Sequence, residues 1–137
     1  MTRLMMLRQR LGMAPAAAAI DLYPREVRNL TEAFSTEADV PTASGTRYLQ
    51  QVCKHWSHSL QVEFTPDHGT IVFPKDSRGA DFPGDALATF DAGTDALTIR
   101  IDASAPEQLE RMKGVIARHV DRFAFREAPM AFTWVDE

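Results

Sequence analysis

The chain of 137 residues has a single cysteine, so it cannot form an internal disulfide. This fits a reducing compartment, and we expect a cytoplasmic protein. The chain also lacks a run of about 18 apolar residues, the length that a membrane-spanning helix needs, so we predict no membrane span. Its glycines form no phosphate-binding loop, since neither "GTDALTI" nor "RGADFPG" matches such a motif.

An excess of positive charge is also missing, because the formal net charge is -4. Residues 1–33 hold five arginines and three acidic residues, a balance of +2, whereas residues 34–137 hold ten basic and sixteen acidic residues, a balance of -6. An acidic body repels phosphate backbones. We therefore expect that the domain does not bind nucleic acid.

The composition that is present suits one globular domain. Hydrophobic residues make up 45% and charged residues 25% of the chain, close to the averages of soluble proteins, so a core can form without a disulfide or a metal. Residues 1–33 are predicted to be a loosely ordered N-terminal extension. Their basic start and alanine run imitate a secretory signal only loosely, because Pro15 and two arginines interrupt the apolar stretch. A single domain is predicted over residues 34–137.

Short stretches rich in strand-forming residues dominate this domain. Strands are predicted at 34–40, 60–65, 70–74, 86–92, 96–103 and 131–135. Between the second and third of them, the turn "PDHG" places Gly69 where a left-handed conformation is expected. In the fifth, Leu97, Ile99 and Ile101 alternate with polar residues, which predicts a sheet with one solvated face.

Two amphipathic helices complete the pattern. Ser44 is the predicted N-cap of the first, whose apolar stripe comprises Tyr48, Leu49, Val52, Cys53 and Trp56. The second opens with Pro106 in its first turn, and its stripe comprises Leu109, Met112, Ile116, His119, Val120 and Phe123. The simplest architecture that buries both stripes is an α+β fold, in which both helices cover one face of an antiparallel sheet.

Histidines are the first candidates for chemistry. "RYLQQVCKHWSH" contains Cys53, His55 and His58, but in neither a zinc-finger nor a metalloprotease spacing. With both helices on one face, His55 and His119 could approach each other and ligate a metal or haem iron. The alternative is that each histidine is a packing residue bonded to a backbone carbonyl. Cys53 lies in the apolar stripe and is expected to be an inert buried thiol.

The second candidate is the block "RHVDRFAFRE". Arg118, Arg122 and Arg126 are four residues apart, which predicts a basic stripe on the second helix. Such a stripe could hold a carboxylate or phosphate, or it could be a solvated helix face. Because no residues assemble into a catalytic set, we expect a binding protein rather than an enzyme.

Together, "VPTASGTRYLQQVCKHWSH" and "RHVDRFAFRE" resemble a bacterial family catalogued as domain of unknown function 2218, over residues 35 to 135. The resemblance implies a TATA-binding-protein-like or phosphohexomutase C-terminal-like α+β layer. Related domains occur beside siderophore-interacting flavin reductases and iron-uptake genes. This neighbourhood implies an accessory role in siderophore, haem or iron handling, with such reductases or iron-uptake components as partners.

Our hypothesis from the sequence is a small accessory binding module with iron, haem or no cofactor. Its anionic ligand would contact the candidate residues His55, His58, His119, Arg122 and Arg126, and His55 and His119 are the metal candidates. The alternative hypothesis is a structural or protein-interaction domain with no small-molecule ligand. The sequence leaves the ligand and the oligomeric state open.

Overall fold

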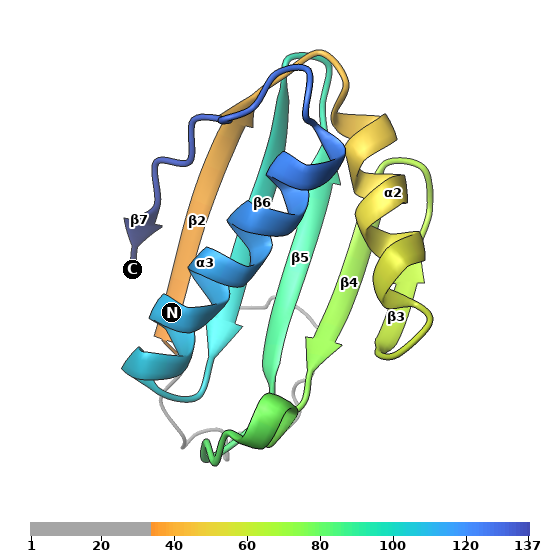
Figure 1. Cartoon of the computed structure of the whole chain (residues 1–137). Helices are drawn as coiled ribbons and strands as arrows, with labels where there is room; N and C mark the ends of the chain where they lie inside the picture. Colours follow the sequence, from red (N-terminus) through yellow and green to blue (C-terminus); the bar gives the residue numbers. More distant parts are fainter. Residues whose placement is uncertain (1–33) are drawn as a thin grey trace. The chain divides into compact units, whose positions relative to one another are not determined.

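The computed structural model describes residues 34–137, so the extension predicted for residues 1–33 lies outside the described residues. The elements are β2 (Phe34–Pro41), α2 (Gly45–Trp56), β3 (Gln61–Phe64), β4 (His68–Phe73), the 3₁₀ turn η1 (Ser77–Gly79), β5 (Ala86–Ala92), β6 (Ala96–Ala103), α3 (Pro106–Phe123) and β7 (Val135–Asp136). Within these residues, six strands form one sheet in the order β3-β4-β5-β6-β2-β7. All neighbouring strands are antiparallel, and both helices lie over the same face of the sheet (Figure 1). The predicted α+β architecture is confirmed.

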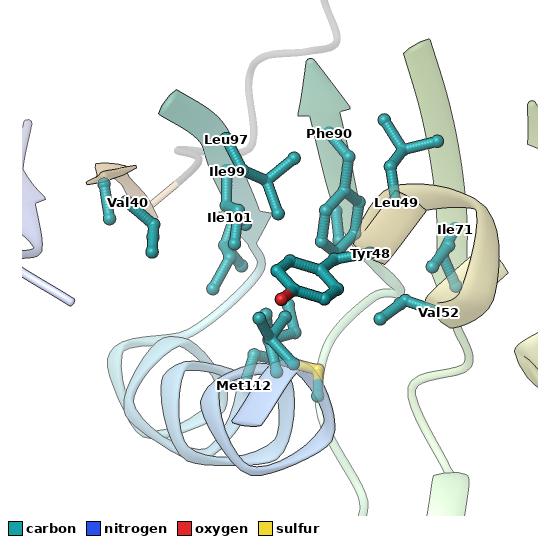
Figure 2. Packing of buried hydrophobic residues seen from close by; sticks show 14 of the residues in the cluster. Val40, Tyr48, Leu49, Val52, Ile71, Phe90, Leu97, Ile99, Ile101 and Met112 are labelled. Carbon is teal, nitrogen blue, oxygen red and sulfur yellow. The ribbon is translucent and has the colours of Figure 1, made fainter. Parts of the chain in front are cut away.

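The alternation in β6 decides which face of the sheet is covered. Leu97, Ile99 and Ile101 are completely buried, and the residues between them are only partly buried. Figure 2 shows the buried side chains of β6 grouped with Phe90 and Tyr48 between sheet and helices. The hydrophobic effect thus drives one face of the sheet against both helices, and the other face carries polar residues, as predicted.

The stripe predicted for the first helix is buried, whereas in the second helix His119 and Phe123 are only partly buried and Gln108 is buried instead. Helix α2 buries Tyr48, Leu49, Val52, Cys53 and Trp56, and α3 buries Gln108, Leu109, Met112, Ile116 and Val120. Ser44 occupies the N-cap position of α2, but its side chain makes no capping hydrogen bond. Its backbone N–H instead donates to the Thr42 hydroxyl over 3.0 Å. In the described part of the chain, neither helix is long and apolar enough to cross a membrane.

Gly69 corrects one prediction. It lies inside β4, paired with Phe90, and Gly79 is the glycine with a positive φ among residues 34–137. A Cβ atom at Gly69 would come within 2.7 Å of the Cys53 Sγ atom on α2. A glycine is therefore needed here for the close approach of helix and sheet rather than for a left-handed turn.

The closing strand is shorter and later than predicted. Strand β7 spans Val135–Asp136 and pairs with Thr36 and Glu37 of β2. Before it, Phe132 and Trp134 stack with ring centroids 5.9 Å apart and pack against the core. These aromatic rings pack on the core, and strand pairing begins only after them, at Val135.

Candidate functional site

The structure places the two metal candidates side by side. The imidazole rings of His55 on α2 and His119 on α3 have centroids 5.4 Å apart. His55 is exposed and His119 is half-buried, whereas His58 is exposed in the turn after α2. In residues 34–137, no group of three or more His, Cys, Asp or Glu side chains is placed to hold a metal ion. The imidazole pair supplies two ligands, fewer than the three or four protein ligands of typical zinc sites.

His119 is held by its own helix. Its Nδ1 lies 2.7 Å from the carbonyl oxygen of Val115, and since a carbonyl only accepts, Nδ1 carries the proton. Burial lowers the pKa of His119, and the nearby His55, Arg122 and Arg118 lower it further, against the opposing effect of the Val115 bond. At neutral pH the ring is therefore uncharged, with Nε2 as an unprotonated acceptor.

Arg126 does not belong to the predicted helical stripe. Helix α3 ends at Phe123, where the N–H of Ala124 donates to Val120. Arg126 lies in the following turn, with its guanidinium 5.7 Å from the ring centroid of Phe125. Arg118 and Arg122 are exposed on α3. The helix ends there because the next residues turn back toward α2, so the prediction of three arginines along one helix is wrong.

Glu127 holds this turn in place. Its carboxylate accepts hydrogen bonds from the Tyr48 hydroxyl and from the Thr42 hydroxyl, the latter over 3.0 Å. The hydrogen bond to Glu127 raises the pKa of Tyr48, and burial adds to the shift. These bonds thus connect Tyr48 of α2 to the end of "RHVDRFAFRE".

Cys53, on the same apolar stripe of α2, is fully buried. Burial raises the pKa of its thiol to about 11, as expected for an inert thiol.

A cavity of about 130 Å³ lies between the end of α2, the loop that contains η1, and α3. Its apolar wall comprises Trp56, Leu60, Phe73, Pro74, Phe82, Met112 and Val115. Its polar lining comprises Ser59, Ser77, Arg78, Gln108, Arg111 and His119. One predicted residue, His119, therefore lines the cavity, whereas the other four candidates do not.

The loop beside the cavity is fastened to the start of α3. Gln108 is 2% exposed, and its Oε1 accepts from the backbone N–H of Ser104 over 2.6 Å. Its Nε2 donates to the carbonyl of Gly84 over 2.9 Å, and the N–H of Gly84 donates to the Ser104 hydroxyl. These bonds satisfy a buried amide and fix the position of the loop that carries Arg78 and Phe82.

Two arginines give the cavity its charge. The Arg111 guanidinium lies 5.7 Å from the ring centroid of Phe82, within the range of a cation–π contact. Arg78 has φ 54° and ψ 40°, a left-handed conformation that is uncommon outside glycine and often marks a functional position. The ion pairs within residues 34–137 use His68, Arg100 and Lys113 as their cations. Arg78 and Arg111 take no part in these ion pairs among residues 34–137.

A family model described as "Uncharacterized protein conserved in bacteria (DUF2218)" matches residues 37–135. The chain belongs to this family. The DUF2218 domain is also similar in structure to PA4090 from Pseudomonas aeruginosa, solved by NMR, with 26% sequence identity and a TM-score of 0.55. The similarity covers 76% of this chain and 95% of the PA4090 chain. No curated protein matches the sequence.

Sequence reasoning missed most of the cavity of this DUF2218 domain. Arg111 could have been found, because Arg111, Val115 and His119 are spaced four apart and therefore share a helix face. Arg78 and Phe82 lie in a loop without periodicity, and only the fold brings them to α3. The candidate arginines 122 and 126 were chosen for their spacing, which carries no information about where a cavity forms.

Proposed function

We propose that this DUF2218 domain is a binding module for a small aromatic anion, held in the cavity between α2, η1 and α3. One observation carries the proposal: a cavity walled by Trp56, Phe73 and Phe82 is also lined by Arg78 and Arg111. Aromatic walls favour a flat apolar ring, and guanidinium groups favour a carboxylate or a similar oxyanion.

The volume limits the size of the ligand. A dry protein cavity of about 150 Å³ holds one benzene molecule, and sites for drug-sized ligands measure roughly 300–1,000 Å³. The cavity of about 130 Å³ therefore suits a single substituted ring. That ring could be a whole ligand or one arm of a larger one whose remainder stays in solvent.

A role in siderophore or iron handling is part of the proposal. Hydroxybenzoate rings, which chelate ferric iron, are flat, rich in oxygen and anionic through their carboxylate, and so match the lining of the cavity. On this proposal the iron arrives with its chelator, and His119 contacts the ring rather than the metal. The one-ring volume favours such a chelator over haem. A siderophore-interacting reductase or an iron-uptake component is the partner that this role implies.

Calorimetric titration of the purified full chain with benzoate and 2,3-dihydroxybenzoate tests the proposal. We expect saturable binding of both acids and at least about tenfold weaker binding by Arg111→Ala, because a hydrogen bond to a charged group is worth about 1.5–3 kcal/mol. Arg122→Ala is the matched control, since Arg122 lies on the same helix and is not among the residues that line the cavity. Folded protein that binds neither acid, or an Arg111→Ala variant that binds both normally, would overturn the proposal.

The iron role has a separate test. The ferric complex of 2,3-dihydroxybenzoate should bind in the same cavity. Free benzoate should therefore compete with the complex, and Arg111→Ala should bind the complex more weakly than the wild type does. If the free acids bind and the ferric complex does not, the ligand-binding function stands and the role in iron handling is wrong.

A protein-interaction domain is the second candidate function. One observation favours it: Phe125 is 69% exposed in the turn after α3, although a large apolar side chain gains free energy when it is buried. If this function is the correct one, Phe125→Ser should abolish association with the partner and leave the melting temperature unchanged. Titration with aromatic acids should then show no binding.

A further inference from the structure

We infer that the ligand carries a hydroxyl group at the end of its ring opposite the anionic group, and that His119 accepts the hydrogen bond from this hydroxyl. The inference rests on the proposed function and ranks ligands within the aromatic anions: a ring with an anion at one end and a hydrogen-bond donor at the other should bind more tightly than 2,3-dihydroxybenzoate, whose hydroxyls lie nearer the anion.

The cavity has two chemically different ends along α3. Arg111, Val115 and His119 follow one another at a spacing of four on one helix face and all line the cavity. A rise of about 1.5 Å per residue separates the Arg111 and His119 backbones by about 12 Å along the axis. Between them the lining residues of the helix are the apolar Met112 and Val115. A ring over this apolar stretch has the cation beside one edge and the imidazole beside the other.

The state of His119 determines which group it can recognise. Nδ1 donates to Val115 over 2.7 Å, so the nitrogen that remains for a ligand is Nε2. Burial, followed by His55 of α2 and the cations Arg122 and Arg118 of α3, lowers the pKa of this ring and disfavours a second proton. Arg78 and Arg111 line the same cavity. Trp56 holds the ring plane, with centroids 4.3 Å apart. A neutral Nε2 accepts from an O–H and repels an anion.

This arrangement distinguishes ligands of almost equal size. A hydroxyl para to the carboxylate reaches His119 when the carboxylate is beside Arg111. A hydroxyl ortho to the carboxylate stays at the arginine end and leaves Nε2 without a donor. The cavity should therefore prefer 4-hydroxybenzoate to its isomer 2-hydroxybenzoate, although the two have the same atoms and net charge at neutral pH.

Calorimetric titration at pH 7.5 with benzoate, 2-hydroxybenzoate and 4-hydroxybenzoate tests the inference on the full chain. We expect 4-hydroxybenzoate to bind about tenfold more tightly than the other two, the value of one added hydrogen bond. His119→Phe keeps an aromatic ring beside Trp56 and removes the acceptor, so all three acids should bind this variant with similar affinity. In the wild-type chain, where no substitution affects folding, 4-fluorobenzoate has nearly the same size and no O–H to donate, so it should bind no more tightly than benzoate.

The outcomes separate this inference from the proposed function. If none of the three acids binds folded protein, the proposed function fails and the inference fails with it. If the acids bind through Arg111 but 4-hydroxybenzoate has no advantage, or if the advantage persists in His119→Phe or is shared by 4-fluorobenzoate, the inference alone is overturned.

Discussion

The indole of Trp56 and the imidazole of His119 lie against each other, with ring centroids 4.3 Å apart and planes tilted by 36°. Trp56 ends α2 within "RYLQQVCKHWSH", and His119 lies on α3 within "RHVDRFAFRE". The contact therefore joins the two sequence blocks on which the family resemblance rests. Both residues also line the cavity, so packing between the helices and the shape of the candidate site depend on the same pair of rings.

The fluorescence of Trp56 should report the protonation of His119, because an imidazolium quenches the emission of a neighbouring indole. The chain has two tryptophans, so Trp134→Phe leaves Trp56 as the only tryptophan. In this background we expect emission to fall as the pH is lowered, with a midpoint below 6.5, since burial lowers the pKa of His119. His55→Gln removes the other imidazole near Trp56, at 5.9 Å, and should leave a transition that His119→Phe abolishes. A midpoint above 6.5 would be inconsistent with this environment.

Stability should depend on pH through the same group. The folded pKa of His119 is lowered from 6.5, so the unfolded chain binds its proton more readily. The contribution of His119 to the free energy of unfolding is therefore complete above pH 6.5 and declines as the pH falls toward the folded pKa. Between pH 7.5 and 5, the melting temperature should fall more for the wild type than for His119→Gln. Equal falls in melting temperature for the two proteins would show that His119 binds its proton equally well in the folded and the unfolded chain.

Gly69 and Cys53 should be coupled. A methyl group at Gly69 would meet the Cys53 Sγ atom at 2.7 Å and the Phe64 Cβ atom at 3.1 Å. We expect Gly69→Ala to destabilise the domain by about 1–3 kcal/mol in urea unfolding, as overpacking usually does. In a Cys53→Ala background the same substitution should cost clearly less, because the sulfur is gone. If the losses in the free energy of unfolding are additive in the double variant, the clash at Gly69 does not involve the Cys53 sulfur.

Tyr48 and Glu127 form a second coupled pair. Tyr48→Phe removes the hydroxyl that donates to Glu127, and we expect a cost of about 1 kcal/mol in chemical unfolding. Glu127→Gln should cost less in the Tyr48→Phe background than in the wild type, because the shared hydrogen bond is already lost. Thr42→Val, which removes the other donor to this carboxylate, is the matched control. Zero coupling between Tyr48 and Glu127 would contradict the contact.

The sequence predicts the elements whose periodicity reflects one buried face. Leu97, Ile99 and Ile101 alternate because β6 is covered on one side only, and the stripe from Tyr48 to Trp56 repeats at helical spacing because α2 packs on the sheet. These patterns are local consequences of burial. They were sufficient to predict the fold class and the approach of His55 to His119, which follows once both helices share a face.

The features that the sequence could not predict depend on contacts between distant residues. After α3 ends at Phe123, Tyr48 and Thr42 bind Glu127, and the spacing of the arginines contains no information about these contacts. Gly69 looks like a turn glycine until the position of Cys53 is known. The cavity depends on the loop with Arg78, which the hydrogen bond from Gln108 to Gly84 holds in place. The sequence does not show this contact between distant residues, and four of the five predicted site residues do not line the cavity.

The most direct test of the account is to locate a bound aromatic acid. Intermolecular nuclear Overhauser effects can be measured between the ring protons of 4-hydroxybenzoate and the isotope-labelled protein. The account predicts contacts to the Met112 methyl group, the Val115 methyl groups and the Trp56 indole, with the carboxylate end of the ring toward Arg111. Contacts confined to the open face of the sheet or to Phe125, or an acid that binds without any contact to the cavity residues, would contradict it.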